Sequence, residues 1–265
     1  MITRRLRVRW ARYLTVCLTL PAAALGCAGR EGDPGAGVVG APTVETLVAR
    51  HIEARGGREN LEAIETLRMS GRATTGPGRE ALVSRLVKPP GRIRTEFSFQ
   101  GVTSVYACDG AVCWYVDPMN GVFAAEPMPP EEAAWSMLEA DVFAAIDWQE
   151  SGHEIELLGT ETIDGRDVHE LEVTLSSGPS RTVYVDVESA LVVRRETRRT
   201  IGGSTVDVQT DFGDFRAVNG LVLPHSIRSR AKGSESVLEV IVEAVEINVP
   251  LDDSVFEMPA AEPID

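Results

Sequence analysis

The sequence predicts a mainly β (α+β) fold, in which about eleven strands form one antiparallel, up-and-down sheet and two helices cover its concave face. Over most of the chain after Ile93, apolar and polar residues alternate, as in strands with one buried and one solvated face. Turn-forming pairs such as Asp109-Gly110 and Asn219-Gly220 recur at short intervals, so we expect consecutive strands to form hairpins. Only two longer stretches have helical spacing.

An export signal is predicted over residues 1–27. Its first part carries no acidic residue, and an apolar stretch from Tyr13 to Gly26 follows, which is the order of a secretory signal peptide. A transmembrane helix needs about 20 apolar residues, whereas this stretch has about 14 and contains Pro21. We therefore expect cleavage and export of the mature protein. The basic residues of the leader are Arg4, Arg5, Arg7, Arg9 and Arg12.

The end of this leader, Leu25-Gly26-Cys27, resembles the lipobox of bacterial lipoproteins. In a lipobox the cysteine receives a diacylglyceryl group and becomes the new N-terminus. Several acyl chains hold a protein stably on a membrane, since each buried methylene contributes about 0.8 kcal/mol. Ala24 departs from the pattern, because most lipoboxes have a larger aliphatic residue there. The alternatives are ordinary cleavage between Ala22 and Ala28, and an uncleaved anchor.

Behind the leader we expect a flexible tether over residues 28–42 and a single folded domain over residues 43–265. The sequence from Glu31 to Pro42 is rich in Gly, Ala and Pro and has no periodicity. A disordered N-terminus without a spacing role is the alternative for this segment. The 265 residues of the chain suit one β-rich domain after removal of the leader.

The chain is strongly acidic, with 26 Lys and Arg against 40 Asp and Glu and a net charge of −14. Loss of the five leader arginines leaves 21 basic residues and a net charge of about −19. Such a charge repels phosphate backbones, and the mature chain has no basic patch to attract an anionic bilayer surface. Nucleic acid is therefore excluded as a partner.

The first helix is predicted from Thr43 to Arg55. Val44, Leu47, Val48 and Ile52 fall on one face of it, Thr43 can cap its start, and Gly56-Gly57 can end it. A short second helical segment is expected where Leu61, Ile64 and Leu67 continue the spacing.

Strands follow, and the clearest begins at Ile93. Ile93, Thr95, Phe97 and Phe99 alternate there with polar residues, and the same inward apolar pattern returns later in the chain. It returns at Val183, Val185, Val187, Leu191, Val193, Val206, Val208 and Phe212. We therefore expect consecutive long strands that turn one apolar face inward.

One helix interrupts the strands, from Glu131 to Ile146. Trp135, Leu138, Val142 and Ile146 have helical spacing, and Glu131 and Glu132 lie in the first turn, where the helix dipole favours acids. This helix and the helix from Thr43 to Arg55 are the candidates for covering the concave face of the sheet.

Two cysteines, Cys108 and Cys113, flank a predicted hairpin turn. A four-residue loop would place them opposite each other, and a disulfide would then form in an oxidising compartment. If the hairpin turns on Asp109-Gly110 alone, the cysteines are out of register and remain free thiols. The four histidines show no metal spacing, so we predict no metal site.

Four arginines follow closely in one predicted strand, at Arg194, Arg195, Arg198 and Arg199. We expect them on a solvated strand surface. The alternative is a docking strip for an acidic partner.

Several segments resemble the outer-membrane lipoprotein-sorting family, the LolA/LolB-like superfamily. They are the hairpin from Ser180 to Asp186 and Leu191 to Glu196, the string from Asp211 to His225, the end from Val245 to Pro259, and the upstream stretches from Ala49 to Gly71 and from Tyr106 to Trp114. These motifs are turns and strand edges rather than catalytic residues. They cover nearly all of the predicted domain.

The resemblance implies an incompletely closed antiparallel β-barrel, with helices over its concave side and an apolar cavity between them. In the family this cavity holds acyl chains: a soluble carrier takes the lipid moiety of a lipoprotein across the periplasm, and a lipid-anchored receptor accepts it at the outer membrane. The expected partners are thus lipid acyl chains or lipoproteins, and the membrane through the lipid anchor at Cys27. We expect a monomeric periplasmic lipoprotein, anchored to the outer membrane, that needs no cofactor and is not an enzyme.

The wall and lid of this cavity should be formed by large apolar side chains of the predicted strands and of the inserted helix. Ordinary core packing is the alternative for each of them. The candidates are Phe97, Phe99, Tyr106, Trp114, Trp135, Leu138, Val142 and Ile146.

Two other functions are compatible with the sequence. Periplasmic stress sensors with the same half-barrel fold bind lipid and protein, so a regulatory sensor is the first alternative. A hydrolase has less support, because the sequence lacks the Gly-x-Ser-x-Gly pattern and a plausible pair of catalytic carboxylates.

Lipidation predicts a direct result from metabolic labelling with a radioactive fatty acid. The wild-type chain should incorporate label, whereas Cys27→Ser should incorporate none, because the acceptor thiol is gone. Equal labelling of the two chains would contradict a lipid anchor at Cys27.

Overall fold

A computed structural model describes residues 42–76, 78–140, 152–176, 180–201 and 204–260, without the side chains of residues 138–140, 200, 201 and 204. The export signal and nearly all of the tether predicted for residues 1–42 lie outside these ranges. Within them, no helix is long and apolar enough to span a bilayer.

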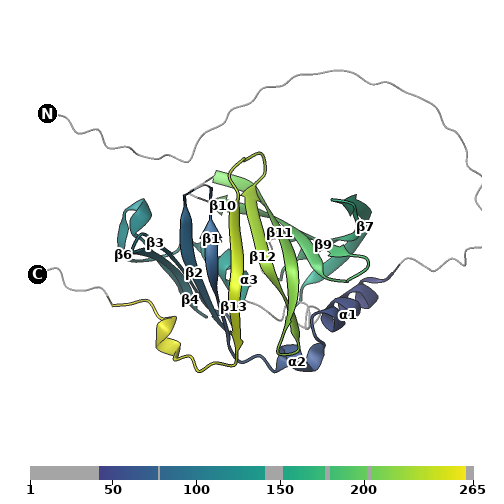
Figure 1. The fold of residues 1–265 in the computed structure, drawn as a ribbon, viewed down its shortest axis with the longest axis horizontal. Coiled ribbons are helices and arrows are strands. Elements are labelled where there is room, and N and C mark those ends of the chain that lie inside the picture. The colour runs from purple at the N-terminus through teal and green to yellow at the C-terminus, as the bar shows by residue number, and fades with distance from the viewer. Residues whose placement is uncertain (1–41, 77, 141–151, 177–179, 202–203, 261–265) are drawn as a thin grey trace, which may run out of the picture. The chain divides into compact units, whose positions relative to one another are not determined.

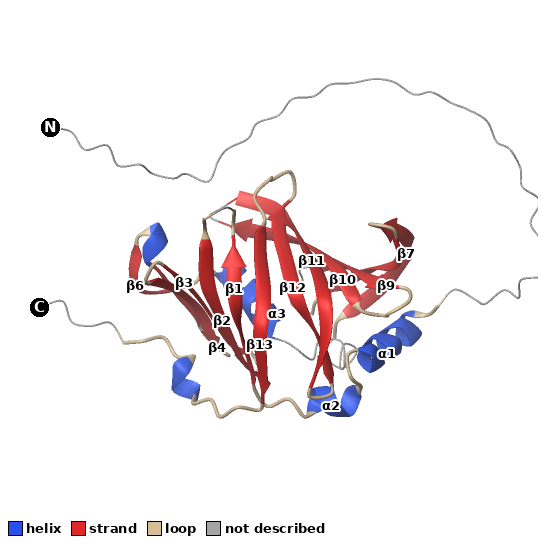
Figure 2. Ribbon diagram, viewed as in Figure 1, coloured by secondary structure: helices blue, strands red, loops and turns tan. Residues whose placement is uncertain are grey.

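The described part is mainly β, as predicted (Figure 2). Its helices are α1 (Val44–Ala54), α2 (Arg58–Glu62) and α3 (Pro130–Ala140), with the 3₁₀ turns η1 (Pro118–Asn120) and η2 (Asp253–Val255). Its strands are β1 (Leu67–Thr74), β2 (Glu80–Lys88), β3 (Arg92–Phe99), β4 (Val102–Asp109), β5 (Cys113–Asp117), β6 (Val122–Pro127), β7 (Glu154–Ile163), β8 (Arg166–Thr174), β9 (Ser180–Asp186), β10 (Val192–Ile201), β11 (Ser204–Val218), β12 (Leu221–Ala231) and β13 (Leu238–Ile247).

All these strands belong to one sheet, in the order β6-β5-β4-β3-β2-β1-β13-β12-β11-β10-β9-β8-β7. The paired neighbours run antiparallel, and nearly all of them are consecutive in the chain. One pair is not: the first strand, β1, pairs with the last, β13, in the middle of the sheet. The two edge strands are β6 and β7. Along the chain, α3 and the residues after it lie between these two strands. The sheet is therefore an open antiparallel barrel built from two meanders.

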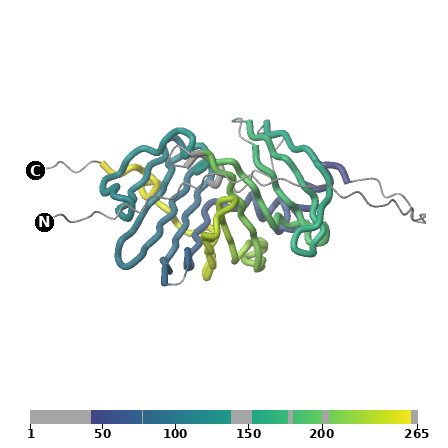
Figure 3. Tube along the Cα trace, turned by 90° about the horizontal axis from the view of Figure 1, so that it is seen from above, coloured from purple at the N-terminus to yellow at the C-terminus, as the bar shows by residue number. Residues whose placement is uncertain are grey.

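The sheet bends into a trough (Figures 1 and 3). Seen from above, β2 to β6 form one limb, the green strands β7 to β10 form the other, and the strands around the pair β1–β13 connect them (Figure 3). Because side chains alternate between the two faces of a strand, one residue in two points into this trough.

Helix α1 forms because its apolar residues lie on one face. Thr43 caps it, since its Oγ1 accepts a hydrogen bond from the Thr46 amide at 3.3 Å. The buried residues are Leu47, Val48 and Ile52. Leu47 packs with Leu171 of β8 and Val185 of β9, so the helix covers the inner face of that limb.

Asn248, just after β13, forms hydrogen bonds that hold the ends of the β1–β13 pair together. It adopts a positive φ of 57°. Its Oδ1 accepts a hydrogen bond from the Glu65 amide at 2.8 Å, and its Nδ2 donates to the Ala63 carbonyl at 2.8 Å. Its own amide donates to the Thr66 carbonyl at 2.8 Å. One side chain thus joins the entry of the first strand to the exit of the last.

The outer face of the β2–β5 limb is covered by the C-terminal segment. Phe256 is fully buried there, and its carbonyl accepts a hydrogen bond from Trp114 Nε1 at 2.8 Å. The Arg94 guanidinium lies 5.7 Å from the Trp114 ring centre and donates to the Val255 carbonyl at 2.9 Å. Lys88 adds an ion pair with Asp253.

The sequence prediction of the elements needs three corrections. The described residues contain thirteen strands rather than about eleven. Leu67, expected in a helix, begins β1. Val193 does not share the inward face of Val185: the register shifts between Val192 and Arg194, and Val193 packs with Val168 and Tyr184 instead.

The β1–β13 pair predicts a sensitive position at Gly71, a buried residue of β1. A Cβ at this position would overlap the backbone carbonyl of Ile241 on β13. We expect Gly71→Ala to lower the free energy of unfolding by about 1–3 kcal/mol, because backbone atoms cannot move aside cheaply. The measurement is urea denaturation.

The matched control is Gly213→Ala on β11, where an added Cβ meets nothing within 4 Å. Its stability should stay near wild type. If wild type, Gly71→Ala and Gly213→Ala have the same free energy of unfolding, the close approach of β1 and β13 at Gly71 does not limit stability.

Candidate functional site

A cavity of about 570 Å³ lies between α1 and the inner face of the sheet. Ligand-binding cavities usually measure about 300–1,000 Å³, so this one can hold a small molecule or an acyl chain. Its wall receives side chains from α1 and from both limbs, namely from β1 to β3 and from β7 to β13.

Most of the wall is apolar, and the period of two explains which residues contribute. On β9, Val183 and Val185 point inward, and on β13 Val240 and Val242 do so. Val185 also packs against Leu47 of α1, so the part of the wall near the helix is continuous with the core. Branched aliphatic side chains form a dry surface that suits hydrocarbon chains.

The wall also contains five arginines and one histidine: His51, Arg55, Arg85, Arg181, Arg195 and Arg199. Arg85 of β2 is held by a hydrogen bond from its Nε to Thr95 Oγ1, at 3.2 Å. Arg195 lies with its guanidinium carbon 5.6 Å from the Phe212 ring centre. The cavity wall is therefore not uniformly apolar.

The four arginines of β10 divide between the two faces of the sheet, which corrects the expectation of one solvated surface. Arg194 pairs with Asp211, and Arg198 pairs with Asp207 at 2.8 Å. Arg195 and Arg199 line the cavity. The reason is alternation along a strand, which sends adjacent residues to opposite faces.

Among the predicted wall residues whose side chains are described, Phe97 alone lines the cavity directly. Tyr106 packs edge-on against it, with ring centres 6.4 Å apart, and stacks on Tyr115 at 6.3 Å. The Tyr106 hydroxyl donates to Asp117 at 2.8 Å, and burial is the main cause that raises the pKa of this phenol. Phe99 is half-buried, one inward position further along β3.

The predicted lid residues lie in or after α3. Trp135 is buried, and the Arg199 guanidinium lies 5.4 Å from its ring centre. Helix α3 therefore contacts β10 on one limb, and it also contacts β3, β4 and β5 on the other. Leu138 belongs to α3, although its side chain is not described, and Val142 and Ile146 lie outside the described residues.

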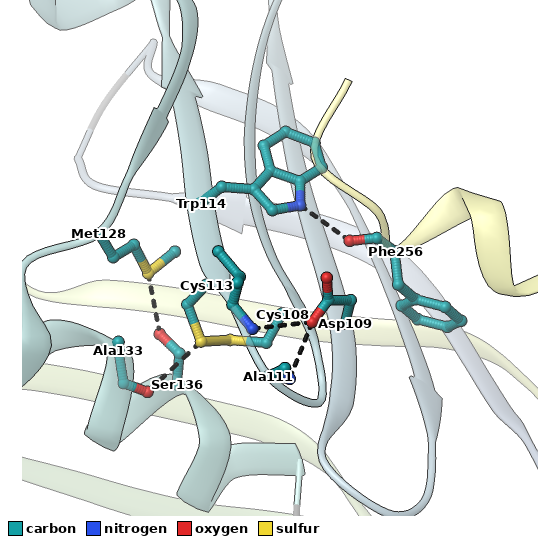
Figure 4. The surroundings of a disulfide bond; sticks show 10 residues. Cys108, Asp109, Ala111, Cys113, Trp114, Met128, Ala133, Ser136 and Phe256 are labelled. Carbon is teal, nitrogen blue, oxygen red and sulfur yellow. Dashed lines mark hydrogen bonds between the residues drawn. A yellow bond between two sulfur atoms is a disulfide. The ribbon is translucent and has the colours of Figure 1, made fainter. Parts of the chain in front are cut away.

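Trp114 lies on the opposite face from the cavity, contrary to the prediction. It follows Cys113 directly, and Cys113 belongs to the inner core cluster, so the next side chain points outward. Figure 4 shows the indole turned toward Phe256 and away from the disulfide. An aromatic residue in an alternating strand did not reveal which face it occupied.

A disulfide joins Cys108 and Cys113 across the β4–β5 hairpin. The two residues are directly opposite in the register, and Asp109 accepts hydrogen bonds from the Ala111 and Val112 amides in the loop between them. The sulfur of Cys113 lies 3.6 Å from the Ala133 carbonyl of α3 (Figure 4). The hairpin thus supports the helix that spans the two limbs.

The histidines show no sign of a metal site. Among the described residues, no group of three or more His, Cys, Asp and Glu side chains could hold an ion. His169 is buried and lies 3.2 Å from Thr160 Oγ1, and His225 is buried beside its own strand, 3.0 Å from the Leu223 carbonyl.

His51 is the titratable histidine of the cavity wall. Its Nδ1 donates to the Ala190 carbonyl at 2.8 Å, because a carbonyl can only accept. Burial lowers the pKa of His51 to about 4, and the positive charge of Arg55 acts in the same direction. The imidazole is therefore neutral at pH 7.

This shift predicts a pH-dependent stability. Between pH 6.5 and about 4 the unfolded chain binds a proton at His51 and the folded chain does not, so stability falls as the pH drops through this window, by up to about 3 kcal/mol. His51→Gln should lose less stability than wild type between pH 7 and pH 4.5 in urea denaturation. Carboxylates contribute equally to both chains, and equal losses would contradict the shift.

Three crystal structures share this fold at low sequence identity. A DUF1329 family protein from Desulfovibrio piger has a TM-score of 0.56 and 13% identity, over 81% of this chain and 97% of that one. A LolA superfamily protein from Nitrosomonas europaea has 0.54 and 14%, over 82% and 98%. A putative outer membrane lipoprotein-sorting protein domain from Vibrio parahaemolyticus has 0.52 and 12%, over 79% and 94%.

Neither a protein-family model nor a curated protein matches the sequence. The similarity therefore lies in the arrangement of the strands and helices, along nearly the full length of each solved structure. The chain has a LolA-like fold, as the sequence resemblance implied.

Proposed function

We propose that this chain is an exported lipid- or lipoprotein-binding protein that shields acyl chains in the cavity between α1 and the sheet. The observation that carries the proposal is the cavity itself: about 570 Å³, with a wall that is mostly aliphatic. Each methylene moved from water to such a wall gains about 0.8 kcal/mol, which is the free energy that keeps a hydrocarbon chain inside.

The openness of the sheet supports a role in uptake and release. The edge strands β6 and β7 are not paired with each other in the described residues, and α3 contacts both limbs. Cargo could therefore enter without breaking the ladder hydrogen bonds of the sheet. Transfer then follows from small differences in affinity between successive pockets.

We also propose that the protein is attached to a membrane. A lipid anchor at Cys27, followed by a tether over residues 28–42, would hold the domain near the outer membrane on its periplasmic side. This layout corresponds to an anchored receptor rather than to a diffusing carrier. We propose no reaction and no cofactor for the cavity.

Bound lipid is the direct test. The exported Cys27→Ser chain, purified without detergent, should carry apolar ligands that native mass spectrometry and lipid extraction detect. A ligand-free mass together with hydrolysis of a model ester would replace the proposal with an enzymatic function.

A variant that fills the cavity sharpens this test. Val208 of β11 lines the wall, so Val208→Trp should lower the lipid bound per mole severalfold, because an indole would occupy the space of the ligand. Gln209→Trp is the matched control, since the next position of the strand points to the opposite face. Both variants should keep the circular-dichroism spectrum of wild type, and equal lipid content would refute the cavity as the binding site.

A further inference from the structure

The cavity wall is divided along the direction of its strands. On the strands beside α1 the lining side chains are apolar, as Val185 of β9 and Val192 of β10 are, although His51 and Arg55 line the wall at the helix itself. Toward the other end of the same strands Arg181 of β9 and Arg199 of β10 line the wall, together with apolar residues such as Val208. From Val192 to Arg199 the strand extends over about 23 Å at about 3.3 Å per residue, which accommodates an extended acyl chain.

Three arginines of β9 and β10 line this wall, and we call them the guanidinium band: Arg181, Arg195 and Arg199. Their grouping follows from the register. Arg181 is directly opposite Thr197, and Arg195 and Arg199 are the inward residues on either side of Thr197. Thr197 is buried, and the three arginines are its neighbours on the inner face of the sheet.

Side-chain contacts hold two of these guanidinium groups in place. Arg199 donates from Nε to Thr197 Oγ1 at 3.2 Å, and its guanidinium carbon lies 5.4 Å from the Trp135 ring centre. Arg195 lies over Phe212 at 5.6 Å. Contacts of this kind fix the orientation of the planar group before a ligand arrives, which lowers the entropy lost on binding.

Hydroxyl groups extend the band across the neighbouring strands. Arg195 is opposite Thr210 of β11, which is opposite Ser229 of β12, and all three line the cavity. The two hydroxyl oxygens are 3.0 Å apart. This row offers hydrogen-bond donors beside the guanidinium groups.

The charges of the wall have one sign. Among the described lining residues there is no Asp and no Glu, although the whole chain has 40 acidic residues. On the outer face of β10, by contrast, Arg194 and Arg198 contact Asp211 and Asp207. Every arginine of the band already makes contacts within the protein, so an incoming anion would add to these contacts or replace some of them.

We propose that the cavity binds an amphiphile with an anionic head group, a phosphate or a carboxylate, which Arg181, Arg195 and Arg199 contact while its chain lies toward α1. Guanidinium groups bind both anions through paired, charge-assisted hydrogen bonds. The proposal rests on the proposed function, because it needs acyl chains in the same cavity. It adds the charge class of the ligand and the direction in which the ligand lies.

The test compares two probes that share one hydrocarbon chain and differ in whether the head group is charged. The exported Cys27→Ser chain is titrated with cis-parinaric acid and with its methyl ester, followed by probe fluorescence. We expect the acid to bind at least about tenfold more tightly, since one charge-assisted contact is worth about this factor. The preference should shrink at high salt.

Arginine variants test which residues cause the preference for the acid. The double change Arg181→Gln and Arg195→Gln should remove most of the preference for the acid and leave ester binding within about twofold, which also shows that the cavity is intact. The control, Arg198→Gln, removes an arginine from the outer face of the same strand and should keep the full preference. A double variant that still prefers the acid as wild type does would overturn the role of the band.

The other outcomes are also decisive. Equal binding of the acid and the ester to wild type would overturn the inference and leave the proposed function standing. Failure of both probes to bind would overturn the proposed function and the inference with it. Inorganic phosphate serves as a competitor: displacement of the acid at low millimolar phosphate, with no binding of the ester, would identify a site for free anions and overturn the amphiphile.

Discussion

The pairing of the first strand with the last is the constraint on which the rest of this structure depends. The other strand pairs join neighbours along the chain, so each meander can form locally, but β1 and β13 meet only when more than 160 intervening residues are already placed. Gly71 allows the two backbones to approach, and Asn248 ties the ends of the pair together. This central pair sets the two limbs on either side of one trough.

The trough then gives every strand two different environments. Outward positions pair charges in water, as Arg198 does with Asp207, or lie under the C-terminal segment, as Trp114 does under Phe256. Inward positions pack against α1, line the space that the helix does not fill, or do both, as Leu171 does. The cavity is the part of the trough that the described side chains leave unfilled.

Local patterns in the sequence were enough for the elements and for the general architecture. The alternation from Ile93 to Phe99 and the spacing of Val44, Leu47 and Ile52 predicted a strand and a helix that the structure confirms. The choice of face was harder, because alternation gives two sets of residues and no sign of which set is inside. Trp114 is apolar yet outward, and Arg195 is charged yet inward. Register shifts, such as the one after Val192, also exchange the faces within a strand, and they depend on the neighbouring strand rather than on local sequence.

The free edges of the sheet have a consequence for the behaviour of the protein at high concentration. Within the described residues β6 and β7 each pair on one side only, and such margins can pair with strands from other copies. On β7, Glu154, Glu156 and Glu161 are exposed. Two copies that met edge to edge along β7 would bring these carboxylates together, and like charges directly opposite each other disfavour such pairing.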